Sequence, residues 1–261
     1  MRHRTTCVLA VLFMAGCTAP TPPPPRWVAH AGCGAGCEAP ANTALAVLQA
    51  MVHRVDGIEL DVQLSADDAL IAFHPDRLET ATNGRGLVNE RAWADLRRLS
   101  LADRPEARLA RVEDLLRLDS TGTLHWVLDI KLFAAGDWVP YLDRFAEVLR
   151  AFEAGGPVPG RVRVECRDLE FLTRLRRRAP HLELGLVAPD PITALGEAKG
   201  RGFQWVVLPP GRANKAVVQA AHRLGLRVST YGASARSELR TAWAAGVDEV
   251  QLDDPSALPV H

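Results

Sequence analysis

The chain has 261 residues, a length that suits one large α/β domain or two small ones. Hydrophobic residues make up 48% and charged residues 24%, which excludes a mostly disordered chain, a collagen and a coiled coil. Thirty-one basic side chains balance 31 acidic ones, so there is no cationic excess that would point to nucleic acid. No apolar run reaches the ~20 residues of a membrane-spanning helix. No protein partner is predicted.

The first 16 residues have the features of an export signal. Arg2 and Arg4 precede a short apolar run, which ends in small residues directly before Cys17. This ending resembles a bacterial lipobox and implies cleavage before Cys17 and lipidation of that cysteine. The alternative is ordinary signal cleavage nearby, with Cys17 incidental. Residues 17–26 then form a proline-rich tether. We therefore expect an exported protein, held by a lipid anchor in the bacterial cell envelope, at the periplasm or the cell surface.

Residues 27–261 alternate between strand-like apolar runs and amphipathic stretches, which predicts a parallel sheet covered by helices. The nine candidate strands begin near Trp27, Gly57, Ala69, Trp126, Val162, Leu184, Trp205, Val228 and Val247. The second and third are too close together for a helical crossover, so they should form a hairpin. Eight strands then remain, the number that a (β/α)8 barrel requires.

The predicted hairpin gathers polar side chains on one face. A turn at residues 66–67 would place Glu59 opposite His74. Glu59 and Asp61 then share one face of the first strand, because side chains alternate along a strand. The opposite, apolar face is expected to carry Ile71 and Phe73.

Acidic and basic side chains recur near the ends of several predicted strands. A lone histidine at a strand end is more often structural, and an aspartate two residues before a lysine also fits an ordinary ion pair. Together, however, three carboxylates, two histidines and a lysine favour metal-assisted phosphoryl chemistry, since buried carboxylates need a counter-charge. These residues are Glu59, Asp61, Asp129, His30, His74 and Lys131.

Short motifs along the chain carry a family resemblance. They are VAHAG at 28–32, PANT at 40–43, GIELDVQL at 57–64, FHPD at 73–76, TNGRG at 82–86, LDIK at 128–131 and the tail at 246–253. In this order they resemble the glycerophosphodiester phosphodiesterases across residues 27–255. The resemblance implies an α/β fold, a TIM (β/α)8 barrel with a small insertion after the second active-site histidine, within residues 77–124.

The resemblance also implies roles for individual residues. His30 and His74 match the two catalytic histidines, a general base and a general acid. Glu59, Asp61 and Asp129 match ligands of a divalent metal, Ca²⁺ or Mg²⁺, with Asp129 standing where the family usually has Glu. Lys131 and Tyr231 match substrate-binding positions; the latter is usually Trp. The implied reaction hydrolyses a glycerophosphodiester to glycerol 3-phosphate and an alcohol.

Two positions depart from the family pattern. Ala31 stands where an arginine usually grips the phosphate, and Ala41 stands where glutamate is usual. A lost charge-assisted phosphate contact costs roughly 1.5–3 kcal/mol. Arg163 or Arg167 would be a replacement cation, although a surface or helix-start arginine is the more ordinary interpretation.

These departures leave other functions open. One alternative is a weakened or inactive barrel lipoprotein that binds phosphodiesters or lipid head groups. Another is a phosphodiesterase directed at lysophospholipids, and a third is a structural surface protein with a vestigial site. The remaining histidines, His53, His125, His181 and His222, have no predicted role in a site.

Two cysteines lie in the loop that lacks the arginine. Cys33 and Cys37 would pair as a disulfide in an oxidising compartment and stiffen this loop. A metal site is the weaker interpretation, because no second cysteine or histidine pair accompanies them. Cys166 ends a predicted strand and is expected to be a buried free thiol.

Overall fold

The computed structural model describes residues 22–155 and 160–258. The predicted signal peptide, Cys17 and the first part of the tether lie outside the described residues. Among the described residues, no helix has both the length and the apolar character to cross a membrane.

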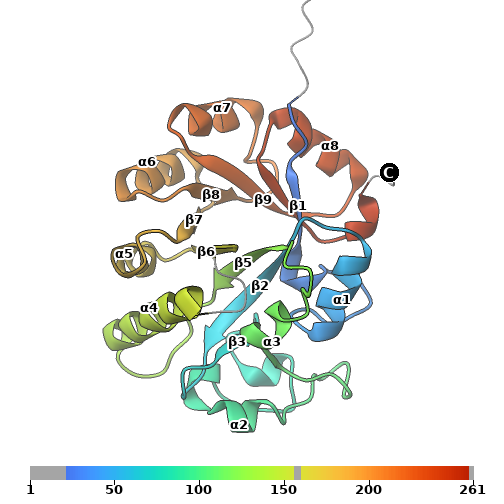
Figure 1. Ribbon diagram of the computed structural model, residues 1–261, viewed down its shortest axis with the longest axis vertical. Helices are drawn as coiled ribbons and strands as arrows, with labels where there is room; N and C mark the ends of the chain where they lie inside the picture. The colour runs from blue at the N-terminus through green and yellow to red at the C-terminus, as the bar shows by residue number, and fades with distance from the viewer. Residues whose placement is uncertain (1–21, 156–159, 259–261) are drawn as a thin grey trace, which may run out of the picture.

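Eight parallel strands close into a barrel (Figure 1). They are β1 (Arg26–Ala29), β2 (Gly57–Leu64), β5 (His125–Ile130), β6 (Val162–Cys166), β7 (Glu183–Val187), β8 (Trp205–Leu208), β9 (Arg227–Ala233) and β10 (Glu249–Leu252). The order around the barrel is β1-β10-β9-β8-β7-β6-β5-β2, and pairing of β1 with β2 closes it. The predicted barrel is therefore confirmed.

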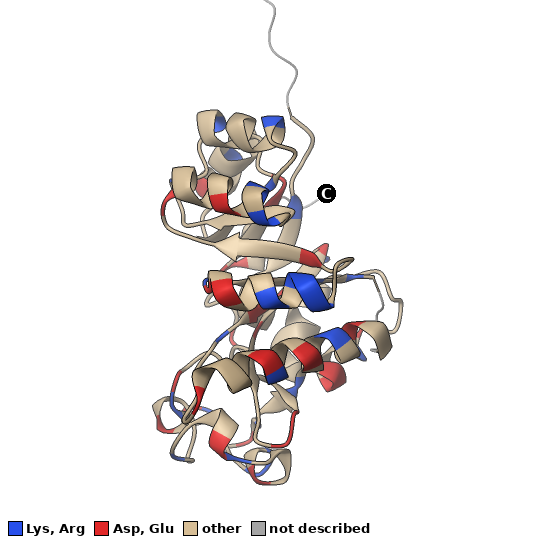
Figure 2. Cartoon of the chain, turned by 90° about the vertical axis from the view of Figure 1, so that its left-hand side faces the viewer, with Lys and Arg blue, Asp and Glu red and all other residues tan. Residues whose placement is uncertain are grey.

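Helices cover the outside of the barrel, with charges of both signs along their exposed faces (Figure 2). They are α1 (Ala44–Val52), α3 (Val112–Leu116), α4 (Trp138–Gly155), α5 (Leu169–Arg178), α6 (Pro191–Arg201), α7 (Lys215–Arg223) and α8 (Arg236–Ala245). Asp168, Asp190 and Asn214 cap α5, α6 and α7 by accepting backbone N–H bonds. Gly202 and Gly246 end α6 and α8 in the left-handed conformation that glycine adopts freely.

A small insertion sits between β2 and α3. β3 (Leu70–Ala72) pairs antiparallel with β2, and β4 (Ala110–Arg111) pairs antiparallel with β3. Between them lie α2 (Trp93–Leu96) and two 3-10 turns, Leu78–Thr80 and Val88–Glu90. The insertion has its own apolar core, made of Ile71, Phe73, Leu78, Val88, Leu96 and Leu109.

The hairpin exists, but its predicted register is wrong by one residue. Val62 pairs with Ala72, and Gln63 pairs with Ile71. The Ser65 hydroxyl accepts the Ala69 N–H at 2.8 Å and donates to Asp67, which stabilises a longer turn than expected. Glu59 is therefore not paired with His74. Ile71 lies on the same face as Gln63 and, like Phe73, packs into the core of the insertion rather than the expected apolar face.

The barrel interior carries a buried charge network. Arg163 on β6 is fully buried, and its guanidinium donates to both Glu249 and Glu165. The guanidinium also lies 4.3 Å from the ring centroid of Trp205, a cation–π distance. Arg163 is thus committed to the interior, and the suggestion that it replaces the missing phosphate-binding arginine is wrong.

Candidate active site

Three carboxylates converge on two neighbouring strands: Glu59 and Asp61 lie within β2, and Asp129 lies near the carboxyl end of β5. The two strands are neighbours, and their register places Asp61 directly beside Asp129. Glu59 lies two residues before Asp61 and faces the same way. One oxygen from each of the three carboxylates lies within 4.8 Å of the others, and Glu59 and Asp61 are each 1% exposed.

Side chains of the protein supply hydrogen bonds and positive charge to only some of the carboxylate oxygens. Lys131 Nζ lies 2.5 Å from Asp129 Oδ2 and 3.0 Å from Asp61 Oδ1. Asn42 donates its amide to Asp61 Oδ2 at 2.8 Å, and its carbonyl accepts the Asp61 backbone N–H at 2.9 Å. Glu59 Oε1 is buried and has no hydrogen-bond partner within the described part of the chain. Such an unpartnered oxygen is costly unless something binds it.

Burial makes the charges of the cluster expensive. Burial, with the repulsion of Asp61 next in size, raises the pKa of Glu59 well above its usual range. Burial likewise raises the pKa of Asp129 to about 7, and Lys131 only partly opposes this. A cation bound between the carboxylates would stabilise their ionised forms. Hard oxygen ligands of this kind suit Mg²⁺ or Ca²⁺, so the residues fit the implied metal.

His30 follows β1 and lies at the edge of the cluster. Its Nδ1 is 2.6 Å from Asp253 Oδ1, and its Nε2 is 3.8 Å from Glu59 Oε2. Burial alone would lower the pKa of His30. The hydrogen bond to Asp253 and the negative charges of Glu59, Asp61 and Asp253 outweigh burial and raise this pKa to about 9.

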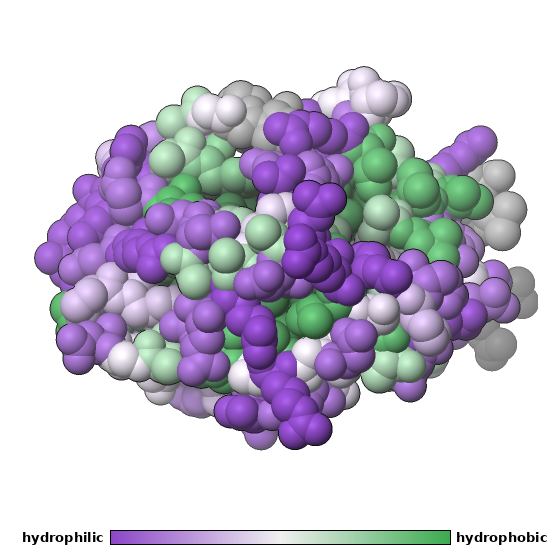
Figure 3. Space-filling view, turned by 90° about the horizontal axis from the view of Figure 1, so that it is seen from below, coloured by the Kyte–Doolittle hydropathy of each residue, from purple (hydrophilic) through white to green (hydrophobic). Residues whose placement is uncertain are grey.

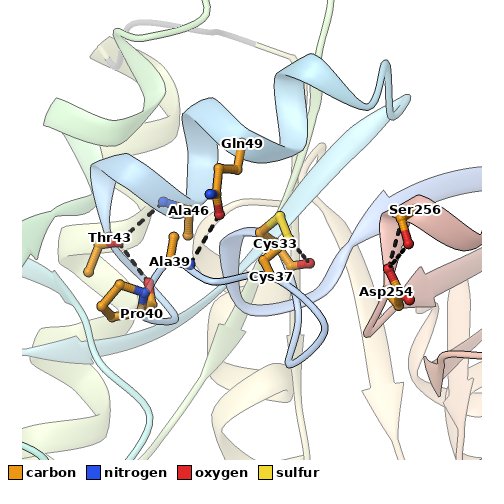
Figure 4. The surroundings of a disulfide bond; sticks show 9 residues. All are labelled: Cys33, Cys37, Ala39, Pro40, Thr43, Ala46, Gln49, Asp254 and Ser256. Carbon is orange, nitrogen blue, oxygen red and sulfur yellow. Dashed lines mark hydrogen bonds between the residues drawn. A yellow bond between two sulfur atoms is a disulfide. The ribbon is translucent and has the colours of Figure 1, made fainter. Parts of the chain in front are cut away.

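The loop after His30 packs against the segment that carries Asp253. The Gly36 N–H donates to the Asp253 carbonyl at 2.6 Å, and a Cβ at Gly34 would clash with the same oxygen. A disulfide joins Cys33 to Cys37 across this loop (Figure 4). The backbone N–H of Ala31 donates to Glu59 Oε2 at 2.6 Å. The loop therefore contacts both Asp253 and the acidic cluster.

The other predicted residues lie around the barrel mouth. The ring centroid of Tyr231 is 6.4 Å from that of His30. His74 is exposed just beyond β3 and lines a cavity of about 400 Å³ together with Asn42. Asn42 therefore borders both this cavity and the acidic cluster, whereas His74 makes no direct hydrogen bond to the cluster among the described residues. Arg167 is exposed just after the end of β6.

Two residues that contact the site have no role predicted from the sequence. Asn42 lies inside the quoted PANT motif, and Asp253 ends the quoted tail. The motifs were therefore a usable signal, but neither contact follows from spacing. Cys166 is buried and free, as expected. His181 and His222 pair with Glu153 and Asp248 away from the cluster.

The fold and the site together define a class: a (β/α)8 barrel with an acidic cluster and a histidine at the carboxyl ends of its strands. The sequence model of the glycerophosphoryl diester phosphodiesterase family matches residues 33–257. The chain belongs to this family and is a phosphoric diester hydrolase.

Known proteins resemble the chain over most of its length. The glycerophosphodiester phosphodiesterase of Caldanaerobacter subterraneus is 24% identical over 84% of this chain and 90% of its own. That of Bacillus altitudinis is 25% identical over 83% and 90%. Among solved structures, glycerophosphodiester phosphodiesterase from Agrobacterium tumefaciens has a TM-score of 0.72 at 21% identity, covering 89% of this chain and 98% of its own. An Oleispira antarctica phosphodiesterase in complex with the product sn-glycerol-3-phosphate has a TM-score of 0.77 at 18% identity, covering 88% and 94%.

Proposed function

We propose that the protein hydrolyses glycerophosphodiesters to glycerol 3-phosphate and an alcohol, with a divalent metal held by Glu59, Asp61 and Asp129. The observation that carries this proposal is the convergence of three carboxylates, two of them fully buried, beside His30. The glycerol 3-phosphate bound to the Oleispira antarctica relative supports the product. The carboxylate oxygens suit both Ca²⁺ and Mg²⁺, so either metal fits the proposal.

The mechanism divides between the metal and the side chains. The metal, when bound, would stabilise negative charge on the phosphoryl oxygens. Asp253 fixes His30 through Nδ1, which leaves Nε2 on the side of the acidic cluster. The raised pKa of His30 suits the acid that protonates the leaving alcohol, which reverses the order of roles given in the sequence analysis. His74 would then accept a proton from the attacking water. Lys131 offsets part of the negative charge of Asp61 and Asp129, and the family resemblance implies that it also binds the phosphate.

Purified protein would be assayed for glycerol 3-phosphate release from a panel of glycerophosphodiesters with Ca²⁺, Mg²⁺ or EDTA. We expect metal-dependent release that disappears in His30→Ala and Glu59→Gln but persists in His53→Ala, which alters an exposed histidine away from the cluster. Glycerol 3-phosphate release that persists in the presence of EDTA and in both the His30→Ala and Glu59→Gln variants would refute the proposal.

A binding protein without turnover is the second candidate. Position 31 carries alanine instead of the family's usual arginine, so it has no side chain that could bind a phosphate. Its backbone N–H is already donated to Glu59. A folded protein that binds metal and glycerol 3-phosphate, yet releases nothing from any substrate, would favour this candidate.

We also propose export and a lipid anchor at Cys17. The Cys33–Cys37 disulfide supports an oxidising compartment. Pro22 to Pro25 lie at the amino-terminal end of β1, opposite His30. An anchor ahead of them therefore leaves the barrel mouth accessible. Fatty-acid labelling of the expressed protein should be lost in Cys17→Ser, and labelling that persists in this variant would exclude the anchor.

A further inference from the structure

An apolar depression leads away from His74. The cavity that His74 lines, about 400 Å³ in volume, lies between the insertion and the residues that precede α1. Its walls are mainly apolar and include Ala41, Phe73, Leu101 and Leu109. Seen from the side of the insertion, apolar side chains occupy hollows between hydrophilic ones (Figure 3). A cavity of this volume is in the range that binds small organic groups.

A second cavity continues the first along α1. It has a volume of about 440 Å³ and reaches Ala44 and Leu45. Six residues line both cavities, so the two adjoin: Glu38, Pro40, Thr43, Arg104, Arg108 and Leu109. We call the two cavities together the α1 groove. From its outer end at Leu45, exposed apolar side chains continue along α1 at helical spacing: Leu45, Leu48 and Val52 are 54%, 47% and 79% exposed.

The charges along the α1 groove nearly cancel. Arg104 and Arg108 line the groove together with the carboxylates of Glu38, Asp103 and Glu106, which leaves one net negative charge. Arg104 also donates to the Glu38 backbone carbonyl at 3.3 Å, which links the two walls. At Ala41 the wall presents only a methyl group. A long, apolar and nearly neutral groove that begins beside a histidine of the site suits a hydrocarbon chain attached to the substrate.

We propose that the α1 groove binds the acyl chain of a lysophospholipid, and that single-chain lysophospholipids are the preferred substrate class. This inference rests on the proposed phosphodiesterase function. Water adds its hydroxyl to phosphorus, and the bond between phosphorus and the head-group oxygen breaks. The head group leaves as an alcohol after taking a proton, and the other product is an acylglycerol 3-phosphate.

The test varies only the chain and keeps the leaving group constant. Choline release by the metal-loaded full-length protein is measured with glycerophosphocholine and with hexanoyl, octanoyl, decanoyl and dodecanoyl lysophosphatidylcholine, below the concentrations at which micelles form. Burial of each methylene is worth about fourfold in binding. We expect kcat/KM to rise at least roughly 10-fold from hexanoyl to decanoyl. Equal kcat/KM for all chain lengths, with glycerophosphocholine hydrolysed, would overturn the groove assignment and leave the proposed function intact.

Two groove variants and one control variant test whether the acyl chain binds in the α1 groove. Ala41→Trp fills its inner end and should remove the dependence on chain length, whereas Ala216→Trp, at an exposed position on α7, should retain it. Leu45→Asp, at the exposed outer end, should reduce kcat/KM for the dodecanoyl substrate more than for the hexanoyl one. Because the readout is a ratio of substrates within one variant, a general loss of activity does not imitate the effect. Unchanged ratios in both groove variants would overturn the proposal.

A binding measurement separates the two proposals when nothing is hydrolysed. Calorimetric titration with glycerol 3-phosphate and with acylglycerol 3-phosphates of rising chain length would then show whether the groove binds the chain. Affinity that rises with chain length supports the groove although the proposed function fails. Affinity that does not rise with chain length refutes binding of the acyl chain in the groove. A chain-length effect confined to glycerophospho-n-alkanols would place the hydrocarbon on the leaving alcohol instead and overturn the acyl assignment.

Discussion

The carboxylate of Asp253 lies 2.6 Å from Nδ1 of His30, although the two residues are 223 positions apart in the chain. Pairing of β1 with β10 brings them together, because Ala29 and Leu252 are partners in the parallel register of these two strands. A histidine held through one ring nitrogen has its other nitrogen fixed in direction. Asp253 is therefore a positioning residue for His30.

Replacement of Asp253 by asparagine should impair proton transfer by His30. The hydrogen bond to Asp253 raises the pKa of His30, so its loss lowers that pKa from about 9 and removes the charged form at a lower pH. We expect kcat to fall by about 100-fold, with the high-pH limb of the kcat profile moved to lower pH. The matched control is Asp254→Asn, which removes a neighbouring carboxylate but no contact of His30, and whose amide oxygen can still cap the 3-10 turn Pro255–Ala257. Equal profiles for the two variants would show that Asp253 does not act through His30.

The barrel could be predicted because alternating strand and helix patterns are local properties of the sequence. The hairpin register could not, since the length of its turn depends on hydrogen bonds of the Ser65 hydroxyl. The role of Arg163 was also hidden. The alternation around Arg163 shows that it faces away from Val162 and Val164, but not that the polar face of β6 points into the barrel. The apolar face packs under the helices instead.

The acidic cluster was easier to foresee than its supports. Glu59 and Asp61 share a face by strand periodicity alone, and adjacency of β2 and β5 follows from the barrel. Asn42 and Asp253 reach the site from loops, where no periodicity fixes the direction of a side chain. Their contacts depend on the folded paths of those loops.

Loss of the Cys33–Cys37 disulfide should destabilise the protein. The bond closes a short loop, and the chain-entropy relation gives about 2 kcal/mol for a ring of this size. For a domain of this length that corresponds to a decrease in Tm of roughly 4–8 °C. The Cys33→Ser/Cys37→Ser double variant should melt lower than the wild type in differential scanning calorimetry. A reductant should lower the Tm of the wild type but not that of the variant, and wild-type melting that is insensitive to reductant would contradict the prediction.

Introduction of an arginine at position 31 should accelerate turnover. Ala31 already occupies a left-handed conformation with φ of 48°, so another non-glycine side chain adds no new backbone strain there. A charge-assisted contact to the phosphate should raise kcat/KM roughly 10- to 100-fold. Ala31→Gln, which is nearly as long but uncharged, is the control. An arginine variant no faster than the glutamine variant would show that the site has no use for a cation at this position.

Asp119 should make the free energy of unfolding depend on pH in the acidic range. Its carboxylate accepts hydrogen bonds from the backbone of Leu124, the hydroxyl of Thr121 and the guanidinium of Arg161. Burial alone would raise the pKa of Asp119, but these bonds outweigh it and hold that pKa below its usual value of 3.8. The unfolded chain thus binds the proton more tightly, so the stabilisation is complete above the unfolded pKa and is lost as the pH falls through the folded pKa.

Asp119→Asn should therefore lower the free energy of unfolding by about 1–3 kcal/mol at pH 7, and the difference from the wild type should shrink below pH 4. Urea denaturation between pH 7 and pH 3 measures it. Asp137→Asn, at an exposed aspartate before α4, is the control for the substitution itself and should cause no comparable loss at pH 7. A difference between Asp119→Asn and the wild type that stays constant down to pH 3 would mean that the loss comes from packing rather than from the charge of Asp119.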